Sequence, residues 1–171
     1  MAQQFHGVIP PVVTPLTADQ KLDLPSFTRS INRMIDAGVN GIFTLGSSGE
    51  VAFSTDARRE EIIRAAIDIV DGRVPVFVGC IDTETNRVIE HACQARELGA
   101  SAIVATAPFY ALGGMAEVER HFRLIHEAVP DLPLFAYDIP VCVHTKLPGD
   151  MLVRLGPVSY THLRAHETVL D

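Results

Sequence analysis

The sequence lacks three features that would each point to a particular class of protein. No apolar run approaches the roughly 20 residues that a membrane-spanning helix needs, and the N-terminus has neither the basic region nor the long apolar segment of a secretory signal. Positive charge is in the minority, with 14 Lys and Arg against 21 Asp and Glu and a formal net charge of -7. Such a surface would repel the phosphates of nucleic acid. We therefore expect a cytoplasmic protein whose partners include neither a membrane nor nucleic acid.

Cysteine is scarce as well, with only Cys80, Cys93 and Cys142 among 171 residues. An odd number leaves at least one thiol unpaired, and the wide spacing fits neither a CxxC metal site nor a disulfide framework. Hydrophobic residues at 47% and charged residues at 20% are typical of an ordinary globular domain. We expect buried structural thiols, no metal site and no cofactor.

The sequence does contain short apolar, β-rich runs that alternate with amphipathic helical stretches at a period near 30 residues. The predicted strands cover residues 8–16, 41–45, 74–80, 101–108 and 134–140. Helices are predicted to begin near Asp23, at Ser54 or Thr55, near Glu84 and after Gly114, and a short one covers 148–155. The first run contains three prolines, which confine it to the start or end of a strand.

This alternation predicts a parallel sheet with helices outside, either a doubly wound sheet or a (β/α)8 TIM barrel. No GxGxxG follows the first run, which is too rich in proline for a dinucleotide-binding turn. Hydroxyl and aromatic residues instead follow the second, fourth and fifth runs, where barrel enzymes carry their chemistry. We favour the barrel. A complete barrel needs roughly 250 residues, so we expect residues 1–156 to form a partial barrel domain of about the first five βα units.

The second run, residues 41–50 (GIFTLGSSGE), ends in small hydroxyl and glycine residues. Gly46 and Gly49 allow a tight turn, and Ser47 and Ser48 add two hydroxyls at the same point. Backbone N–H groups and hydroxyls at the carboxyl end of a strand make a small anion cradle. These four residues are therefore candidates for binding a carboxylate or a phosphate.

Three motifs follow one another at the ends of the second, fourth and fifth runs: GSSGE at 46–50, APFY at 107–110 and YDIP at 137–140. On these motifs the chain, from about residue 5 to 156, resembles the dihydrodipicolinate synthase/N-acetylneuraminate lyase family of class I aldolases. The resemblance implies a homotetrameric TIM barrel that forms a Schiff base between a lysine and pyruvate or another 2-keto acid. The implied activity is that of a carbon-carbon or carbon-oxygen lyase.

The resemblance also implies roles for individual residues. Ser47 and Ser48, with their backbone amides, would bind the carboxylate of the 2-keto acid. Tyr137 would be the proton shuttle, a general acid-base role that requires a positioned hydroxyl. Tyr110 would join Ser47 and Tyr137 in a proton relay, and in the synthases this tyrosine comes from a neighbouring subunit.

The chain departs from the synthase pattern two residues after Pro140, where the synthases have an arginine that binds a substrate carboxylate and this chain has Cys142. A thiol cannot replace the bidentate contact of a guanidinium. The resemblance is therefore closer to aldolases of sugar acids or related 2-keto acids than to the lysine-pathway synthases. Asp138 stands where the family usually has asparagine, which is a smaller departure than that at Cys142.

A second departure concerns the Schiff-base lysine, which the family carries on its sixth strand. The only lysines here are Lys21 and Lys146, both expected to be solvated surface charges. Residues 157–171 have no sustained β-rich run and resemble a cloning-derived tail, which we expect to be artefactual. Within it, His162 and His166 have the i, i+4 spacing of a helical metal site but no third ligand in view, so we expect a solvated helix without metal. We expect the chain by itself to be an inactive fragment that aggregates through its open sheet edges.

Two alternative functions stay open. The Gly-Ser loop could hold phosphate in a barrel enzyme of another group, although barrel phosphate sites usually follow strands seven and eight. The chain could also be a non-catalytic fragment that binds a small molecule, because a fold does not fix a function.

Overall fold

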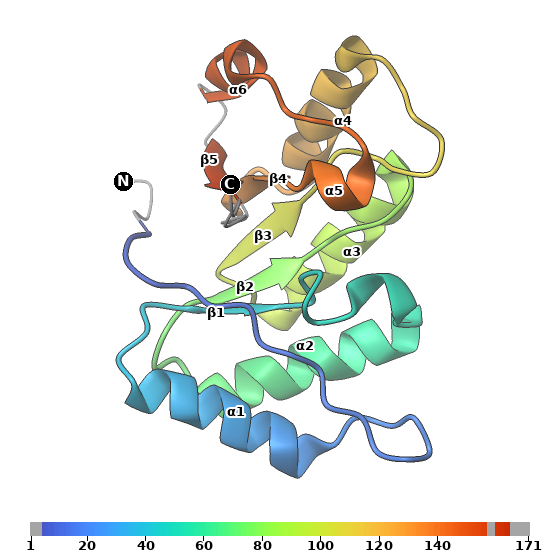
Figure 1. The fold of residues 1–171 in the computed structure, drawn as a ribbon. Helices are drawn as coiled ribbons and strands as arrows, with labels where there is room; N and C mark the ends of the chain where they lie inside the picture. The colour runs from blue at the N-terminus through green and yellow to red at the C-terminus, as the bar shows by residue number, and fades with distance from the viewer. Residues whose placement is uncertain (1–4, 157–159, 165–171) are drawn as a thin grey trace, which may run out of the picture.

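The computed structural model describes residues 5–156 and the backbone of residues 160–164. Its centre is one parallel sheet of five strands: β1 (Ile42–Thr44), β2 (Val76–Gly79), β3 (Ala102–Ala105), β4 (Leu134–Asp138) and β5 (Tyr160–Arg164). Neighbouring strands pair in the order in which they occur in the chain (Figure 1). A doubly wound sheet reverses its strand order at a switch point, so the observed order is that of a barrel wall.

The described residues also contain six α-helices and one 3₁₀ helix: α1 (Leu24–Asp36), η1 (Val51–Phe53), α2 (Asp56–Val70), α3 (Thr85–Leu98), α4 (Met115–Ala128), α5 (Pro140–Val143) and α6 (Gly149–Leu155). The predicted starts of three helices are confirmed, since Asp23, Thr55 and Glu84 each accept a hydrogen bond from the backbone N–H three residues ahead. The sequence prediction did not include η1 and α5, which are only three and four residues long.

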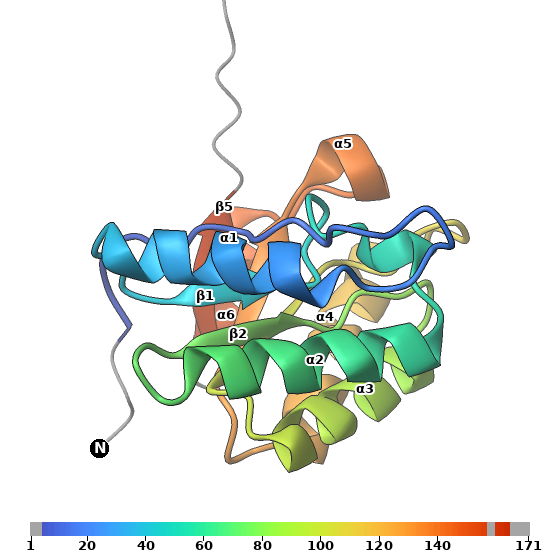
Figure 2. The same ribbon diagram turned by 90° about the horizontal axis from the view of Figure 1, so that it is seen from below.

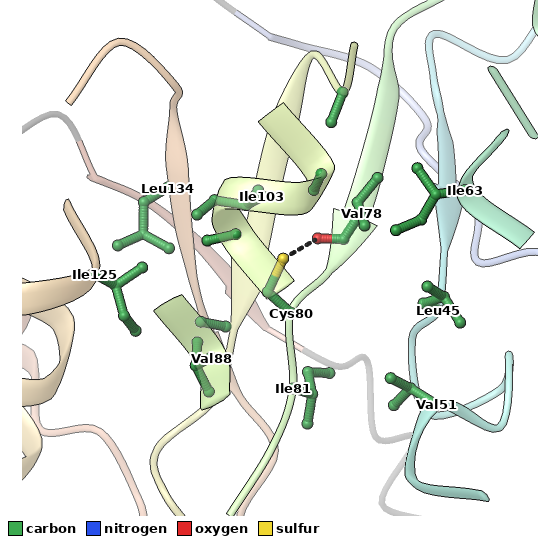
Figure 3. Packing of buried hydrophobic residues seen from close by; sticks show 14 of the residues in the cluster. Leu45, Val51, Ile63, Val78, Cys80, Ile81, Val88, Ile103, Ile125 and Leu134 are labelled. Carbon is green, nitrogen blue, oxygen red and sulfur yellow. Dashed lines mark hydrogen bonds between the residues drawn. The ribbon is translucent and has the colours of Figure 1, made fainter. Parts of the chain in front are cut away.

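The outer face of the sheet packs against helices α1 to α4, which follow one another along that side (Figures 1 and 2). The largest side chains of this core are fully buried: Phe27, Ile31, Ile62, Ile103, Phe122, Ile125 and Leu134. Figure 3 shows Ile103, Leu134 and Ile125 side by side in this core, and Val51 and Ile81 towards the carboxyl ends of the strands. The outer core therefore joins every strand from β1 to β4 to its own helices.

The inner face carries a second, smaller cluster that is rich in aromatic rings. Phe77 of β2 lies between two other rings, with ring centroids 4.8 Å from Phe5 and 5.0 Å from Phe135, both in edge-to-face contact. Phe43 of β1 contacts the ring of Tyr137 edge-on at 6.1 Å. The N-terminal segment and three strands are thus joined on the side that faces the inside of a barrel.

The first predicted strand, at residues 8–16, is not a strand in the structure. It runs beside β1 with a single bridge from Pro11 to Phe43. Val12 N–H donates to the Phe43 carbonyl at 2.8 Å, and Phe43 N–H donates to the Pro10 carbonyl at 3.0 Å. The physical reason is the prolines, which have no N–H to extend the ladder. The segment still occupies the place of a strand at this edge of the sheet.

The expectation of a tail without a strand is wrong for residues 160–164. They form β5, which pairs with β4 in register from Leu134 with Tyr160 to Asp138 with Arg164. Strand pairing uses backbone groups, so an unpaired edge of β4 can accept a further strand. The predicted open edge at β4 is therefore covered. His162 lies in this strand and not in a helix, whereas residues 157–159 and 165–171, His166 included, lie outside the described residues.

Candidate functional site

The loop after β1 is a tight, internally bonded turn. Gly49 N–H donates to the Gly46 carbonyl at 3.0 Å, and Glu50 N–H donates to the Ser47 carbonyl at 3.1 Å. The Thr14 hydroxyl donates to the Gly49 carbonyl at 2.8 Å and ties the loop to the N-terminal segment. Two of these hydrogen bonds lie within the turn, and the third holds the turn against the N-terminal segment.

The two glycines of this turn are needed for packing. A Cβ on Gly46 would lie 2.8 Å from the ring of Phe43, and one on Gly49 would lie 3.1 Å from the backbone nitrogen of Leu45. In the described part of the chain the N–H groups of Ser47 and Ser48 make no hydrogen bond, unlike that of Gly49. The N–H groups of the two serines are therefore available as donors, whereas the Gly49 N–H is already used.

A pocket of about 320 Å³ opens at the carboxyl ends of the strands. Its polar wall consists of Ser47, Glu50, Thr106 and Tyr137. Its apolar wall includes Phe53, Ile81, Phe109, Ile139, Cys142 and Val143. We call it the carboxyl-end pocket. It lies where barrel enzymes place their active sites, and the loops after β1, β2, β3 and β4 all contribute to it.

Two of the predicted site residues line the carboxyl-end pocket, Ser47 from the loop after β1 and Tyr137 from β4. Tyr137 is half-buried, and its ring is held edge-on by Phe43. Its hydroxyl makes no hydrogen bond to any residue that the structure describes. Ser47 and Tyr137 thus both line one pocket, and the Tyr137 hydroxyl is available to hydrogen-bond a ligand.

The other predicted residues do not lie in the pocket wall. Tyr110 is 95% exposed and has a left-handed backbone, with a φ of 76°. Ser48 is exposed, as Ser47 is, but it is not among the residues that line the pocket. The predicted relay of Ser47, Tyr110 and Tyr137 is therefore not assembled within the described part of this chain.

Several residues of the pocket wall were missed by the sequence analysis. Thr106 directly follows β3, and Ile81 follows β2 after one residue, so their places at strand ends were a usable signal. Phe53 and Val143 come from η1 and α5, which were not predicted. No cationic side chain lies among the described residues of the wall, whose one charged group is Glu50.

A buried histidine supports the pocket from behind. His121 of α4 is 1% exposed; its Nε2–H donates to the Thr106 carbonyl at 3.1 Å, and its Nδ1 accepts from the Thr85 hydroxyl at 3.0 Å. The carbonyl can only accept, which assigns the proton to Nε2. Burial lowers the pKa of His121 to about 4, so the ring is neutral at pH 7. It connects the end of β3 to the first turn of α3.

The loop after β4 is held by the residue that departs from the family pattern. Asp138 is buried, and its Oδ1 accepts from the Leu147 N–H at 3.0 Å. This bond closes the excursion through α5 that brings Cys142 and Val143 to the pocket. An asparagine carbonyl oxygen could accept the same bond, so the exchange does not alter this contact.

Both lysines are surface residues, as predicted. The Lys21 side chain is 78% exposed, and its Nζ lies 2.9 Å from Asp19 Oδ2. Lys146 is exposed between α5 and α6. Neither belongs to the wall of the carboxyl-end pocket, so no lysine amine faces this cavity within the described residues.

The three cysteines differ in environment, and Cys93 on α3 is partly buried. Cys80 is buried, its thiol lies 3.7 Å from the Val78 carbonyl oxygen, and burial raises its pKa to about 12. The prediction of a buried structural thiol is confirmed for this residue. It is wrong for Cys142, which is exposed and lines the pocket because α5 turns it outward.

Within residues 5–156 and 160–164, no three His, Cys, Asp or Glu side chains gather as a metal site would require. The helices in the same part of the chain are too short or too polar to cross a bilayer.

Comparison with known proteins identifies relatives of this chain. An uncharacterized DapA-like lyase of Halobacterium salinarum is 38% identical over 155 residues, which are 90% of this chain and 50% of that protein. The putative 2-dehydro-3-deoxy-D-gluconate aldolase YagE of Escherichia coli is 41% identical over 136 residues, 80% of this chain and 45% of YagE. The crystal structure of YagE in complex with pyruvate superimposes with a TM-score of 0.87 at 37% identity, covering 91% of this chain and 52% of YagE.

The chain thus spans about half the length of the curated relatives it matches. Its parallel sheet corresponds to part of their (β/α)8 barrel, as predicted from the sequence. Residues 4–159 match the family described as the dihydrodipicolinate synthetase family, which includes lyases of the aldolase type. On the strength of this match and of the shared fold, the chain belongs to the dihydrodipicolinate synthetase family.

Proposed function

We propose that this chain is the keto-acid-binding part of a Schiff-base aldolase or lyase that acts on pyruvate or a related 2-keto acid. The observation that carries the proposal is the meeting of Ser47 and Tyr137 in one pocket at the carboxyl ends of the strands. The pyruvate complex of YagE, which is 37% identical in structure-based comparison, supports a small 2-keto acid as the ligand.

The carboxylate of the keto acid would bind at the turn after β1. The hydroxyl of Ser47 and the free N–H groups of Ser47 and Ser48 are donors that a carboxylate can accept together. The Tyr137 hydroxyl would then exchange protons with the keto oxygen and with the carbinolamine that an attacking amine forms. In this proposal the turn binds the negatively charged carboxylate, and the phenol of Tyr137 transfers protons.

The amine that forms the imine is proposed to lie outside these 171 residues. Lys21 and Lys146 are the only lysines, and both are exposed away from the pocket wall. Without a lysine at the keto carbon the chain has no nucleophile for imine formation. We therefore propose that the chain alone binds a 2-keto acid without cleaving or condensing it.

The part of the pocket wall around Cys142, where the second substrate would bind, favours an uncharged aldehyde. Cys142 stands where the synthases have an arginine, and the surrounding wall is formed by Phe53, Ile139 and Val143. A second carboxylate would meet no cation there, and it would also face Glu50. We propose a sugar-acid aldolase specificity, in keeping with the 41% identity to the putative 2-dehydro-3-deoxy-D-gluconate aldolase YagE.

Tyr110 is proposed to act in a second copy of the chain. Its side chain is 95% exposed beside Leu112 and Met115, which are also exposed apolar residues. A side chain of this kind at a subunit interface can reach a neighbouring pocket, and the family pattern provides for such a contact within a homotetramer. We propose the same assembly for the whole protein, in the cytoplasm.

Calorimetric titration of the chain with pyruvate tests the proposal. Ser47→Ala removes a donor to a charged group, a loss that corresponds to roughly tenfold to hundredfold weaker binding. Ser30→Ala is the matched control, because Ser30 lies on α1 and bonds only to the Ser26 carbonyl there. Equal affinities for the wild type and Ser47→Ala would contradict the proposal. Tighter binding of inorganic phosphate than of pyruvate would favour the alternative phosphate-binding enzyme.

Borohydride reduction in the presence of pyruvate tests the place of the amine. We expect no increase in the mass of the chain attributable to a reduced imine at the pocket, because neither lysine faces it. A stoichiometric adduct on Lys146 that Tyr137→Phe abolishes would overturn this part of the proposal.

A further inference from the structure

A buried arginine outside the pocket connects two segments of the pocket wall. Arg59 of α2 is only 5% exposed. Its Nη1 donates to the Ile81 carbonyl at 3.0 Å, and its Nε donates to the Ser54 carbonyl at 3.4 Å. Ile81 lines the pocket, and Ser54 directly follows Phe53, which also lines it. One guanidinium therefore joins the segment after β1 to the segment after β2.

The charge of this arginine is compensated by Asp82, which is itself 8% exposed. Arg59 Nη2 lies 3.4 Å from Asp82 Oδ2, which also accepts from Arg87 Nε at 3.0 Å and from His91 Nε2 at 3.1 Å. The Thr83 N–H donates to the other oxygen at 2.7 Å. A buried charge pair is tolerated when its remaining hydrogen-bonding groups are satisfied in this way.

The carboxylate of Asp82 stays ionised in this setting. Burial alone would raise its pKa, but hydrogen bonds from Thr83 and His91, together with the charge of Arg59, outweigh burial and lower the pKa below its ordinary value. The Arg59–Asp82 pair is thus a permanent ion pair at neutral pH. It fixes the direction in which the guanidinium presents its other two nitrogens.

We propose that Arg59 is a positioning residue that sets the distance between the Phe53 and Ile81 sides of the pocket, and so selects the part of the substrate beyond its 2-keto acid end. The proposal rests on the proposed function for the identity of the ligand. Only a guanidinium can serve here, because its planar fork reaches two carbonyls and a carboxylate at once. A lysine at this position would keep the charge and lose the fork.

The first test measures the wall without any ligand. In Arg59→Lys we expect the NMR signals of the Ile81 methyl groups and of the Phe53 ring to shift, because both segments lose a fixed contact. The matched control is Arg64→Lys, which changes another arginine of α2 whose guanidinium pairs with Glu60 at 2.8 Å on the exposed surface. Unchanged Ile81 and Phe53 signals in a folded Arg59→Lys variant would overturn the proposal.

The second test compares a short and a long ligand, pyruvate and 2-dehydro-3-deoxy-D-gluconate. Arg59→Lys should weaken binding of the longer ligand by about tenfold while changing pyruvate affinity by less than about twofold. Ser47→Ala should weaken both ligands alike, because both carry the same carboxylate. Equal losses for the two ligands in Arg59→Lys would reduce Arg59 to a general structural role and overturn the proposal. If the wild type binds neither ligand, the proposed function fails. The NMR signals of Ile81 and Phe53 without ligand then still show whether Arg59 positions these two sides of the pocket.

A milder variant covers the case in which Arg59→Lys does not fold. Asp82→Asn retains the size of the side chain and one acceptor oxygen but removes the charge that orients Arg59. We expect the same Ile81 and Phe53 signals to shift and the long ligand to be weakened more than pyruvate, both to a smaller extent. A folded Asp82→Asn variant with wild-type signals and a wild-type affinity ratio would contradict the proposal.

Discussion

The two faces of the sheet are built from different side chains and serve different ends. The outer face carries mainly aliphatic residues that are closed off by the chain's own helices. The inner face carries a small set of aromatic rings in edge-to-face contact, one of which is Tyr137 of the pocket. The outer face therefore contributes most of the buried apolar core of this partial barrel, whereas the inner face holds the ring of Tyr137 in the pocket.

The largest effect should come from the outer face. Ile103 is fully buried between the helices and the sheet, and Ile103→Ala should lower the free energy of unfolding by about 3 to 4 kcal/mol through lost contacts and a residual cavity. Urea denaturation measures this loss. Pyruvate affinity of the folded variant should stay at the wild-type value. A tenfold weaker affinity would break the separation between the two faces.

His121 makes the stability of the outer side depend on pH. Its folded-state pKa of about 4 lies below the ordinary 6.5, so the neutral ring is favoured in the folded state. This contribution is fully present above pH 6.5 and is lost as the pH falls from 6.5 through 4, with a total of about 3 kcal/mol. Denaturation curves at several pH values should show the loss in the wild type. If the free energy of unfolding of His121→Gln falls as steeply with decreasing pH as that of the wild type, His121 is not the source of the pH dependence.

An intermediate effect is expected from the inner face. Phe43→Leu removes the edge-on contact with Tyr137 and should cost about 1.5 kcal/mol of stability. Unlike Ile103→Ala, it should also weaken pyruvate binding, because the phenol loses the ring that holds it. Denaturation and calorimetry on the same preparation measure both quantities. A loss of stability with unchanged affinity would show that the inner face does not position the site.

The smallest effect is expected at the surface. Lys21→Gln breaks an exposed ion pair with Asp19, and such pairs contribute little to stability. The urea midpoint and the pyruvate affinity should both match those of the wild type. A clear loss of pyruvate binding would place Lys21 in the site and would contradict its surface assignment.

The sequence was sufficient for the regular part of the fold. The caps Asp23, Thr55 and Glu84 and the apolar runs determine helices and strands by local chemistry, and the structure has these elements where they were predicted. The proline-rich run at 8–16 could be recognised as an unusual strand, but the single bridge that it makes depends on its neighbour β1. β5 was missed because its pairing comes from the free edge of β4 and not from a strong pattern of its own.

The site was predicted only where its residues belong to the sequence motifs at the ends of strands. Ser47 and Tyr137 lie in motifs at strand ends, and both line the carboxyl-end pocket. Phe53 and Val143 reach the pocket through η1 and α5, whose short turns have no periodic signal. The contact of Arg59 with two carbonyls is long-range in the chain, and no local pattern encodes it.

The central claim is that the turn after β1 binds the carboxylate of a 2-keto acid. The most direct measurement is a titration of the ¹⁵N-labelled chain with pyruvate, followed through the backbone amide signals. The account predicts saturable shifts that are largest at Ser47 and Ser48, whose N–H groups are free, and that need at least about tenfold more pyruvate to saturate in Ser47→Ala. Shifts that are largest elsewhere, or that persist unchanged in Ser47→Ala, would contradict it.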